Sequence, residues 1–366
     1  MKNGFFSSEL VENIRRNNGI FECGNGRTIL LPKTFGFCSG VFNAVSKLSE
    51  TVENNKNMAI RLMGAMIHNP AVNSHFAKSG VNIWDSQNLD AMFNLPNQNT
   101  LFVIPAFGLP IDIDCRLRNY VLSDTQIVDA TCPFVRRVWE QAKLAGKNGN
   151  AVIIHGKHGH QETNAIWSRA VKFAKACALL TSPEDAKRFA ADYTNIPEER
   201  LFSPELLANR PWTLINQTTM LSTETAEIAE ILKVASWHHT SVELAGTLCP
   251  ATRNRQLAAK ELCNANCDAI FILGGTDSSN TTQLYRMAAE HIGETHCFFV
   301  QSSQNILEDA IENYHPAESK WTVAPLPYCK TIGILTGASC PDSELEKLIL
   351  RLTEEAISKI LDDFHN

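Results

Sequence analysis

The sequence predicts an α/β protein whose sheets are mostly parallel. Its short apolar runs end in glycine, and helical patterns follow them; the clearest runs are Leu101 to Gly108, Ala151 to Gly156, Ala269 to Gly275 and Thr331 to Gly337. Continuous apolar runs bounded by turn residues are typical of buried parallel strands. Because ligands of such sheets bind beyond the carboxyl ends of the strands, we expect the chemistry in the loops that follow these runs.

Helical periodicity appears in residues Thr281 to Ala289 and in Glu344 to Ile360, and the second pattern is amphipathic. Breaks near Cys132 and Cys249 divide the chain into comparable α/β lobes. The expected parts are an N-terminal extension (1–27), lobe 1 (28–132), lobe 2 (133–248), lobe 3 (249–345) and a C-terminal helix (346–366). An alternative places the first strand of lobe 1 in lobe 3.

Composition indicates a globular protein with more than one domain, since 44% of its 366 residues are hydrophobic. The first residues lack the apolar stretch of a signal peptide, and no segment approaches the roughly 18 apolar residues of a membrane span. We therefore expect a cytoplasmic protein without membrane contact. A net charge of −6 and the absence of a long basic run argue against nucleic acid as a partner. This charge distribution is compatible with a small phosphorylated ligand, which neutral donors can bind.

Three of the eleven cysteines have nearly the same surroundings: Cys38, Cys132 and Cys249 each stand at the first turn of an expected helix. Pro133 and Pro250 occupy the first helical position, where a missing N–H costs nothing. The N–H groups and partial positive charge at a helix start favour thiolate, which can act as a metal ligand or nucleophile. One thiolate from each of three lobes suits a metal centre with one open coordination position.

The other eight cysteines are best interpreted as small buried apolar residues. An odd number of cysteines without a secretion signal disfavours a disulfide framework. Cys263 and Cys267 have the spacing of half a metal site, but no second pair or nearby histidine completes it.

The loop from His155 to Glu162 combines three imidazoles, a lysine and a carboxylate after an apolar run. Alone, such a loop predicts either zinc or nickel binding or merely a solvated loop. Glu162 beside His160 is better matched to proton transfer, because a carboxyl and an imidazole can both carry a proton near neutral pH.

A second loop supplies hydroxyl and amide groups directly before a helix, at Ser278, Ser279 and Asn280. This composition suits phosphate oxygens, although an ordinary helix cap is the commoner explanation. The same composition recurs around Ser339, after another run, which favours anion binding. Thr218 and His68 are weaker signals, and a lone histidine such as His68 is more often a satisfied core residue.

In combination these motifs resemble the LytB-type 4-hydroxy-3-methylbut-2-enyl diphosphate reductases over roughly residues 28 to 345. The motifs that carry the resemblance occur in the family's order: Gly36-Phe-Cys38-Ser-Gly-Val, Ile67-His68-Asn69, Asp129-Ala-Thr-Cys132-Pro, Gly159-His160-Gln-Glu162, Gln217-Thr218-Thr219, Cys249-Pro-Ala-Thr-Arg-Asn-Arg-Gln256, Ser278-Ser-Asn280 and Gly337-Ala-Ser339. The resemblance implies a trefoil of α/β lobes around a [4Fe-4S] cluster held by Cys38, Cys132 and Cys249. One iron would stay open for the substrate's hydroxyl group.

The family's reaction removes the allylic hydroxyl reductively and gives isopentenyl and dimethylallyl diphosphate, the last step of the non-mevalonate isoprenoid route. The resemblance implies Glu162 as proton donor, with His160 and Thr218 completing the relay and also contacting substrate. It further implies that His68, Ser278, Ser279, Asn280 and Ser339 bind the diphosphate. A ferredoxin or flavodoxin would supply the electrons.

The chain departs from the family pattern in its additional N-terminal extension and at three residues. The usual histidine of an Ala-His-Gly loop is Phe107 here, a residue that can neither donate a hydrogen bond nor carry charge. Loss of one charge-assisted hydrogen bond costs about 1.5–3 kcal/mol of binding. Gln161 replaces a usual proline and Pro250 a usual tyrosine, so a divergent paralogue with altered affinity or substrate stays open.

Other functions also fit parts of the sequence. One is a three-lobed cluster enzyme of the quinolinate synthase type, in which an open iron performs a dehydration. Another is a non-catalytic redox sensor that uses the cluster as a switch, and a structural zinc site is a weaker third. The phosphate loop and the Glu162 relay favour the reductase over these alternatives.

Overall fold

A computed structural model describes residues 4–23, 26–86 and 88–363, with side chains described to residue 353. The ends of the predicted extension and C-terminal helix (1–3 and 364–366) and residues 24–25 lie outside the described residues. The chain forms two compact units. Unit 1 comprises Met1–Ser39, His68–Pro70 and Ala251–Asn366, and unit 2 comprises Gly40–Ile67 and Ala71–Pro250.

Unit 1 is built on a five-stranded sheet of order β1-β2-β16-β12-β13. Its strands are β1 (Ile20–Glu22), β2 (Thr28–Leu30), β16 (Thr331–Thr336), β12 (Ala269–Leu273) and β13 (Cys297–Val300). All neighbours pair in parallel except β1 and β2. β12 is buried along its whole length, as expected for a central strand covered on both faces. β2 thus lies beside β16, so the N-terminal strands share a sheet with the C-terminal part of the chain.

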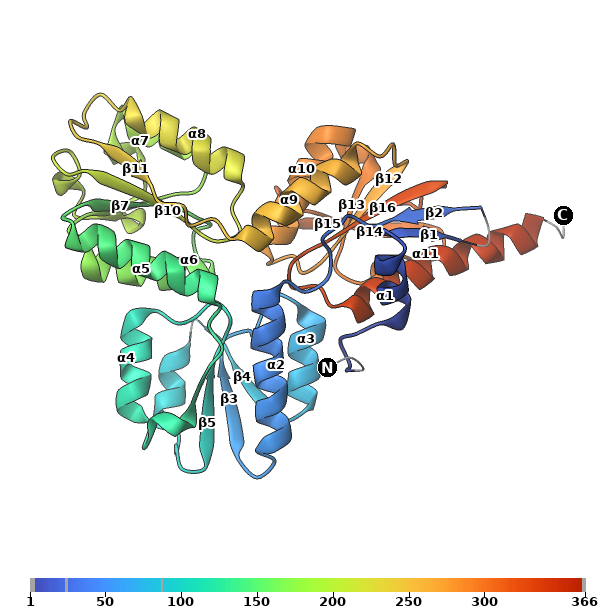
Figure 1. Ribbon diagram of the computed structural model, residues 1–366, viewed down its shortest axis with the longest axis horizontal. Helices are drawn as coiled ribbons and strands as arrows, with labels where there is room; N and C mark the ends of the chain where they lie inside the picture. Colours follow the sequence, from blue (N-terminus) through green and yellow to red (C-terminus); the bar gives the residue numbers. More distant parts are fainter. Residues whose placement is uncertain (1–3, 24–25, 87, 364–366) are drawn as a thin grey trace. The chain divides into compact units, whose positions relative to one another are not determined.

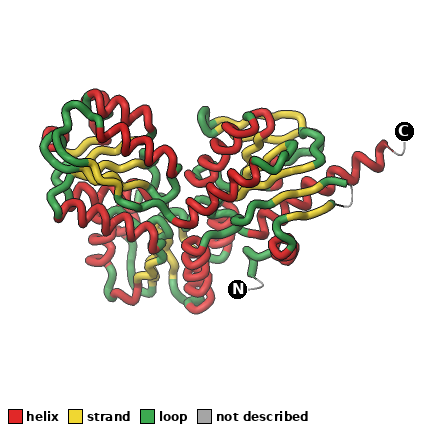
Figure 2. The backbone as a smooth tube through the Cα atoms, turned by 45° about the horizontal axis from the view of Figure 1, so that its top comes forward, coloured by secondary structure: helices red, strands yellow, loops and turns green. Residues whose placement is uncertain are grey.

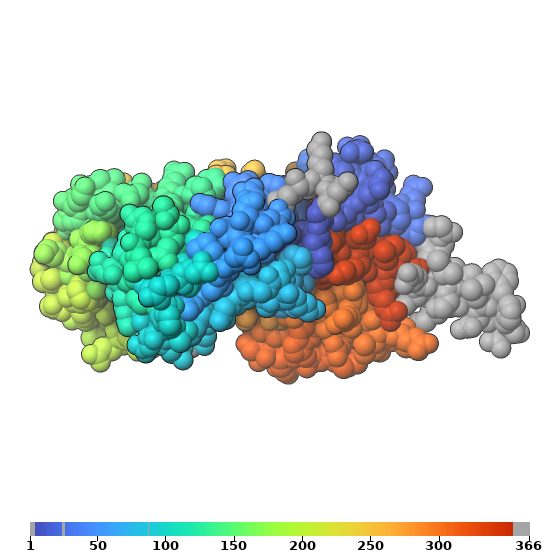
Figure 3. Space-filling model, turned by 90° about the horizontal axis from the view of Figure 1, so that it is seen from below, coloured from blue at the N-terminus to red at the C-terminus, as the bar shows by residue number. Residues whose placement is uncertain are grey.

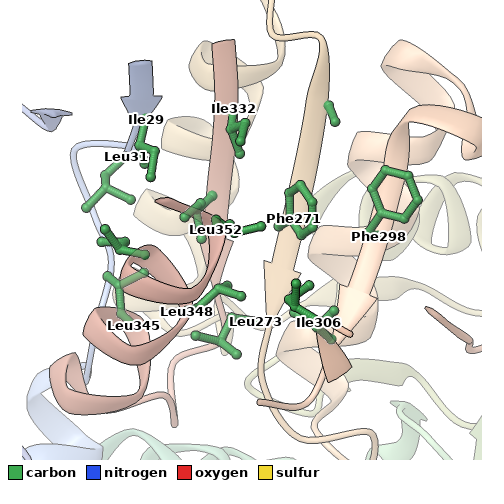
Figure 4. Packing of buried hydrophobic residues seen from close by; sticks show 14 of the residues in the cluster. Ile29, Leu31, Phe271, Leu273, Phe298, Ile306, Ile332, Leu345, Leu348 and Leu352 are labelled. Carbon is green, nitrogen blue, oxygen red and sulfur yellow. The ribbon is translucent and has the colours of Figure 1, made fainter. Parts of the chain in front are cut away.

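Helices cover both faces of this sheet. They are α1 (Glu9–Arg16), α9 (Pro250–Cys263), α10 (Ser279–Ile292) and α11 (Asp342–Asp363). α9 and α10 pack their apolar residues on one face, whereas α1 and α11 pack on the other. Figure 4 shows Leu345, Leu348 and Leu352 of α11 against Ile332 and the neighbouring sheet residues. In Figure 3 the dark blue N-terminal segment lies beside the red start of α11. The described part of the N-terminal extension therefore contributes to the core of unit 1.

Unit 2 contains two sheets. The strands of the first, in the order β4-β3-β5-β6, are β3 (Ala59–Met63), β4 (Val81–Trp84), β5 (Thr100–Ile104) and β6 (Ile127–Asp129). The strands of the second, in the order β11-β10-β7-β8-β9, are β7 (Ala151–His155), β8 (Cys177–Leu180), β9 (Leu201–Phe202), β10 (Trp212–Asn216) and β11 (Val242–Leu244). Pairing is parallel throughout except between β8 and β9.

Helices also enclose both sheets of unit 2. They are α2 (Ser39–Asn54), α3 (Pro70–Lys78), α4 (Ile111–Tyr120), α5 (Pro133–Lys147), α6 (Gln161–Phe173), α7 (Pro183–Ala191) and α8 (Ser222–Lys233). α5 and α6 cover one face of the second sheet, and α7 and α8 cover the other (Figure 1). On the first sheet, α4 packs on the strands opposite α2 and α3. Figure 2 shows the strands as yellow layers between red helices.

The predicted fold class is confirmed, because the apolar runs form the parallel strands β5, β7, β12 and β16. The helix expected at Thr281 to Ala289 is α10, and the amphipathic pattern from Glu344 is α11. An antiparallel hairpin was not predicted; its strands are β14 (Ala310–His315) and β15 (Lys320–Pro325). Within the described residues, no helix combines the length and the apolar character that crossing a bilayer requires.

Candidate functional site

Glu162 lies in the first turn of α6, at the carboxyl end of β7, and is 1% exposed. Thr218 follows the neighbouring strand β10 and binds both carboxylate oxygens. Its backbone N–H donates to Oε1 at 2.6 Å, and its hydroxyl bonds to Oε2 at 2.9 Å. The parallel pairing of β7 and β10 brings these two strand ends together. Glu162 is therefore a buried carboxyl in a fixed orientation.

Burial raises the pKa of the Glu162 carboxyl from 4.5 to about 7, although the two bonds from Thr218 oppose this shift. Burial acts in this direction because a low-dielectric surrounding disfavours the charged form. A carboxyl with this pKa holds a proton at neutral pH for a large fraction of the time. Such tuning is typical of a general acid or base.

His160 caps the N-terminus of α6, immediately before the turn that holds Glu162. Its Nδ1 accepts the backbone N–H of Glu162 at 3.1 Å, which fixes the neutral ring with its proton on Nε2. The ring of Phe107 meets the imidazole edge-to-face, with centroids 5.6 Å apart. Phe107, which replaces the usual histidine of the family, thus lies directly against His160, a predicted substrate-binding residue.

The predicted anion-binding residues share unit 1, at the ends of β12 and β16. Ser278 caps α10 by accepting the Thr281 N–H at 3.3 Å. Asn280 Oδ1 accepts the Ala338 N–H at 2.9 Å, and Ser339 Oγ donates to the His68 carbonyl at 3.1 Å. These bonds join the loop after β12, the loop after β16 and the His68 segment. Ser279 lies in the first turn of α10 and is buried.

Two buried polar atoms in this loop have no hydrogen-bond partner among the described residues: Asn280 Nδ2 and Thr281 Oγ1. Both residues are buried, and both atoms can donate. Buried donors without partners are costly, and a bound anion would satisfy them. A Cβ at Gly274 or Gly337 would collide with Thr281 Oγ1, so both glycines leave room for this hydroxyl.

Thr281 was not predicted as a site residue, although an internal repeat points to it. Gly156 precedes Thr163 by the same spacing as Gly274 precedes Thr281. In unit 2, Thr163 Oγ1 donates to Gln217 Oε1 at 2.9 Å. The residue after β16 that corresponds to Gln217 is a glycine, which leaves Thr281 without that acceptor. The repeat is a signal that sequence reasoning could have used.

The loop of Cys38 is tied to the end of β16. Cys38 donates its N–H to the Ala338 carbonyl at 3.1 Å, and Gly36 donates to Thr336 Oγ1 at 2.9 Å. α2 begins at the residue after Cys38. The half-buried cysteine therefore stands at a helix start, as predicted.

The other two predicted ligands lie in unit 2, also at helix starts. Cys132 is the N-cap of α5 and donates its N–H to the Ala106 carbonyl at 2.9 Å. Asp129 Oδ1 accepts the Thr131 N–H at 2.9 Å and so shapes this loop. Cys249 directly precedes α9, and Thr247 Oγ1 donates to Asn216 Oδ1 at 2.6 Å. Neither Asp129 nor Asn216 was singled out from the sequence as a residue that positions a cysteine.

The remaining cysteines differ from these three. Burial raises the pKa of Cys177 and Cys297 to about 12 and that of Cys263 and Cys329 to about 11, so these thiols stay neutral. Cys115 is exposed, contrary to the expectation that the remaining cysteines are buried. Its place on the outer side of α4 explains the difference, since that helix packs on the core through Leu117, Ile113 and Tyr120.

No group of three histidine, cysteine, aspartate or glutamate side chains in the described ranges is arranged to hold a metal ion. Cys38 belongs to unit 1, whereas Cys132 and Cys249 belong to unit 2. The three-cysteine site thus stays a prediction. The donor chemistry fits an iron–sulfur cluster, since thiolates are its usual ligands and all three cysteines stand at helix starts.

The fold and these features define an α/β protein with helix-terminal thiols, a buried carboxyl whose pKa is raised toward neutrality, and a loop before α10 that carries buried donors without partners among the described residues. The family model described as LytB protein matches residues 29–353. The chain belongs to the LytB family.

Curated relatives are similar in sequence over nearly the whole chain. A protein of Prochlorococcus marinus (strain MIT 9515) named 4-hydroxy-3-methylbut-2-enyl diphosphate reductase is 32% identical over 95% of this chain and 90% of its own length. A protein of the same name from Synechocystis sp. is 32% identical over 95% of this chain and 94% of its own length.

Solved structures show the same fold. A reductase structure from Plasmodium falciparum matches with a TM-score of 0.69 at 21% identity, covering 89% of this chain and 87% of its own. A second structure, titled as (E)-4-hydroxy-3-methyl-but-2-enyl diphosphate reductase, matches with a TM-score of 0.56 at 23% identity. It covers 89% of this chain and 99% of its own.

Proposed function

We propose that this chain is a 4-hydroxy-3-methylbut-2-enyl diphosphate reductase. It would remove the allylic hydroxyl and release isopentenyl and dimethylallyl diphosphate, the last step of the non-mevalonate isoprenoid route. The observation that carries the proposal is the buried Glu162 carboxyl, with its raised pKa, in a chain of the LytB family. Loss of a hydroxyl group as water requires a proton, and Glu162 is built to hold one.

Cys38, Cys132 and Cys249 would hold a [4Fe-4S] cluster with one open iron. Each stands at a helix start, where unpaired N–H groups favour thiolate. When bound, such a cluster supplies electrons and a Lewis-acidic iron. The other thiols of the chain are poor candidates for cluster ligands, because burial keeps several of them neutral. Burial raises the pKa of Cys177, for example, to about 12.

Glu162 is the proton donor in this proposal. Thr218 fixes both carboxyl oxygens, so the proton has a defined direction of transfer. His160 contributes a neutral imidazole whose Nε2–H can donate a hydrogen bond to substrate, because Nδ1 is occupied by the Glu162 N–H. In this proposal His160 orients the substrate, and Glu162 protonates the leaving hydroxyl group.

The diphosphate would bind to His68, Ser278, Ser279, Asn280 and Ser339, and Thr281 joins this set. The support is chemical, since Asn280 Nδ2 and Thr281 Oγ1 are buried donors that lack a partner in the described part of the chain. The start of α10 adds partial positive charge. Neutral donors of this kind can hold an anion in a protein of net charge −6.

Phe107 distinguishes this chain from the family pattern and places an apolar ring edge against His160. We infer that the chain binds the diphosphate more weakly than it would with a histidine at this position. The rest of the proposed set is present, so the substrate class does not change.

A ferredoxin or flavodoxin as electron donor and a cytoplasmic location complete the proposal. The family resemblance supports the donor and the sequence pattern supports the location, and each can be tested separately from the chemistry.

The test is whether the allylic diphosphate changes the spectrum of the cluster. Protein purified without oxygen is analysed for iron and sulfide, and its electron paramagnetic resonance spectrum is recorded with and without 4-hydroxy-3-methylbut-2-enyl diphosphate. We expect an iron–sulfur spectrum that the substrate perturbs and that inorganic diphosphate alone perturbs less. Protein containing zinc in place of iron and sulfide would contradict the cluster, and an unperturbed cluster would contradict the substrate.

A further inference from the structure

Arg255 in α9 is a buried cation without a carboxylate partner. It is 2% exposed, and no ion pair to it exists among the described residues. Its Nη1 donates to the Thr336 carbonyl at 2.8 Å and to Thr336 Oγ1 at 3.2 Å, and its Nη2 donates to the Gly36 carbonyl at 2.8 Å. The guanidinium therefore binds the loop before Cys38 and the end of β16 at once.

A buried charge is costly unless an opposite charge compensates it. Burial lowers the pKa of Arg255, and negative charge at Cys38 raises it more than that at Cys340 or Asp342. Burial also raises the pKa of Cys340, which keeps that thiol neutral. The Asp342 carboxylate already accepts bonds from Arg15 Nη2 at 3.0 and 3.2 Å. As a cluster ligand, the Cys38 sulfur would add a negative charge on the loop that Arg255 binds.

The loop that Arg255 binds has little freedom. Gly36 has φ +74°, a conformation that favours glycine, and a Cβ there would collide with Asp342 Oδ1. The Gly36 N–H to Thr336 Oγ1 and Cys38 N–H to Ala338 bonds hold the same loop from the side of β16. Arg255 adds the third connection and the only charge among them.

We propose that Arg255 is a positioning residue for the cluster, which fixes the Cys38 loop and supplies a positive charge beside the Cys38 thiolate. This inference rests on the proposed function, because it assumes that Cys38 is a cluster ligand. A fixed positive charge stabilises the more negative, reduced state and so raises the reduction potential. The fixed loop slows loss of iron.

Three variants separate the charge from the fixation. R255Q removes both, R255K keeps the charge but cannot reproduce the forked bonds, and T336V removes only the hydroxyl shared by Arg255 and Gly36. The measurements are the reduction potential of the cluster and the rate at which a chelator removes its iron, both on anaerobically prepared protein.

We expect R255Q to show a more negative potential and iron loss about tenfold faster, which corresponds to about 1.4 kcal/mol of lost stabilisation. R255K and T336V should keep a potential near that of the unaltered protein but lose iron faster. An R255Q cluster with unaltered potential and unaltered iron loss overturns the inference. If R255Q does not fold, unaltered iron loss in both R255K and T336V overturns it. Unaltered protein that contains no iron–sulfur cluster overturns the proposed function instead.

Discussion

Thr218 holds both oxygens of the Glu162 carboxyl, one through its backbone N–H and one through its hydroxyl. The two residues come from different strand ends of one parallel sheet, β7 and β10. Because the carboxyl is buried, its pKa rises to about 7, yet its orientation is fixed by an ordinary threonine. A raised pKa and a fixed carboxyl geometry are thus combined in one pair of residues.

Replacing Glu162 by Gln keeps the shape of the side chain but removes the transferable proton. We expect turnover to fall by at least about 100-fold, the usual contribution of general acid catalysis, while iron and sulfide content stay unchanged. Glu184→Gln, on the exposed side of α7, is the matched control and should behave as the unaltered protein. Turnover that survives in E162Q would show that Glu162 is not the acid and would favour a sensor role.

Turnover should fall as pH rises through about 7, because ionised Glu162 has no proton to give. The same raised pKa means that folding stability linked to Glu162 is greatest at low pH and is lost as pH rises through 7. Thr218→Val removes a hydrogen bond that lowers this pKa, so the alkaline limb of the pH profile should move to higher pH. Thr219→Val, a neighbouring hydroxyl bound to Gln217, should leave the profile in place. A profile shifted to lower pH in T218V would contradict this assignment.

Replacing Phe107 by His should strengthen substrate binding. One charge-assisted hydrogen bond is worth about 1.5–3 kcal/mol, so KM for the allylic diphosphate should fall about tenfold or more. Phe107→Leu removes the ring contact with His160 without adding a donor and serves as the comparison. Equal KM values for F107H and F107L would mean that position 107 does not reach the diphosphate.

Serine at Cys38, Cys132 or Cys249 should abolish cluster binding, because a hydroxyl is a poor substitute for a soft thiolate ligand. Iron and sulfide per chain are the readout. Cys115→Ser changes an exposed thiol and should leave both contents unaltered. Full iron content in any of the three ligand variants would remove that cysteine from the set.

The N-terminal helix α1 should contribute to global stability, since Val11 and Ile14 are buried in the core of unit 1. Ile14→Ala is expected to lower the free energy of unfolding by about 2–5 kcal/mol. Ile20→Ala, at a residue 42% exposed, should have a much smaller effect in the same denaturant titration. Equal effects would mean that α1 is only loosely attached.

The sequence was sufficient to predict the central strands, because β7, β12 and β16 are continuous apolar runs that end in glycine. It did not predict the β14–β15 hairpin, most of whose residues are only partly buried or exposed and mix polar with apolar side chains. The attachment of the N-terminal strands to β16 could be offered only as an alternative. Strand pairing depends on contacts distant in sequence, which local periodicity does not record.

The site shows a similar division. Glu162 and His160 were predicted from their residue types and Thr218 from the family resemblance, and the structure adds that His160 and Thr218 each bond to Glu162. The supporting residues Asn216 and Asp129 were not predicted, since a polar residue that shapes a loop has no distinctive local pattern. Arg255 was quoted as part of a motif, but its burial and its bond to Gly36 depend on the folded chain.

The most direct test of the central claim is conversion of the substrate itself. Anaerobically prepared, chemically reduced protein is incubated with 4-hydroxy-3-methylbut-2-enyl diphosphate, and the products are separated and identified. We expect isopentenyl and dimethylallyl diphosphate from the unaltered protein and almost none from E162Q. Recovery of intact substrate from unaltered protein that carries a full iron–sulfur cluster would contradict this claim.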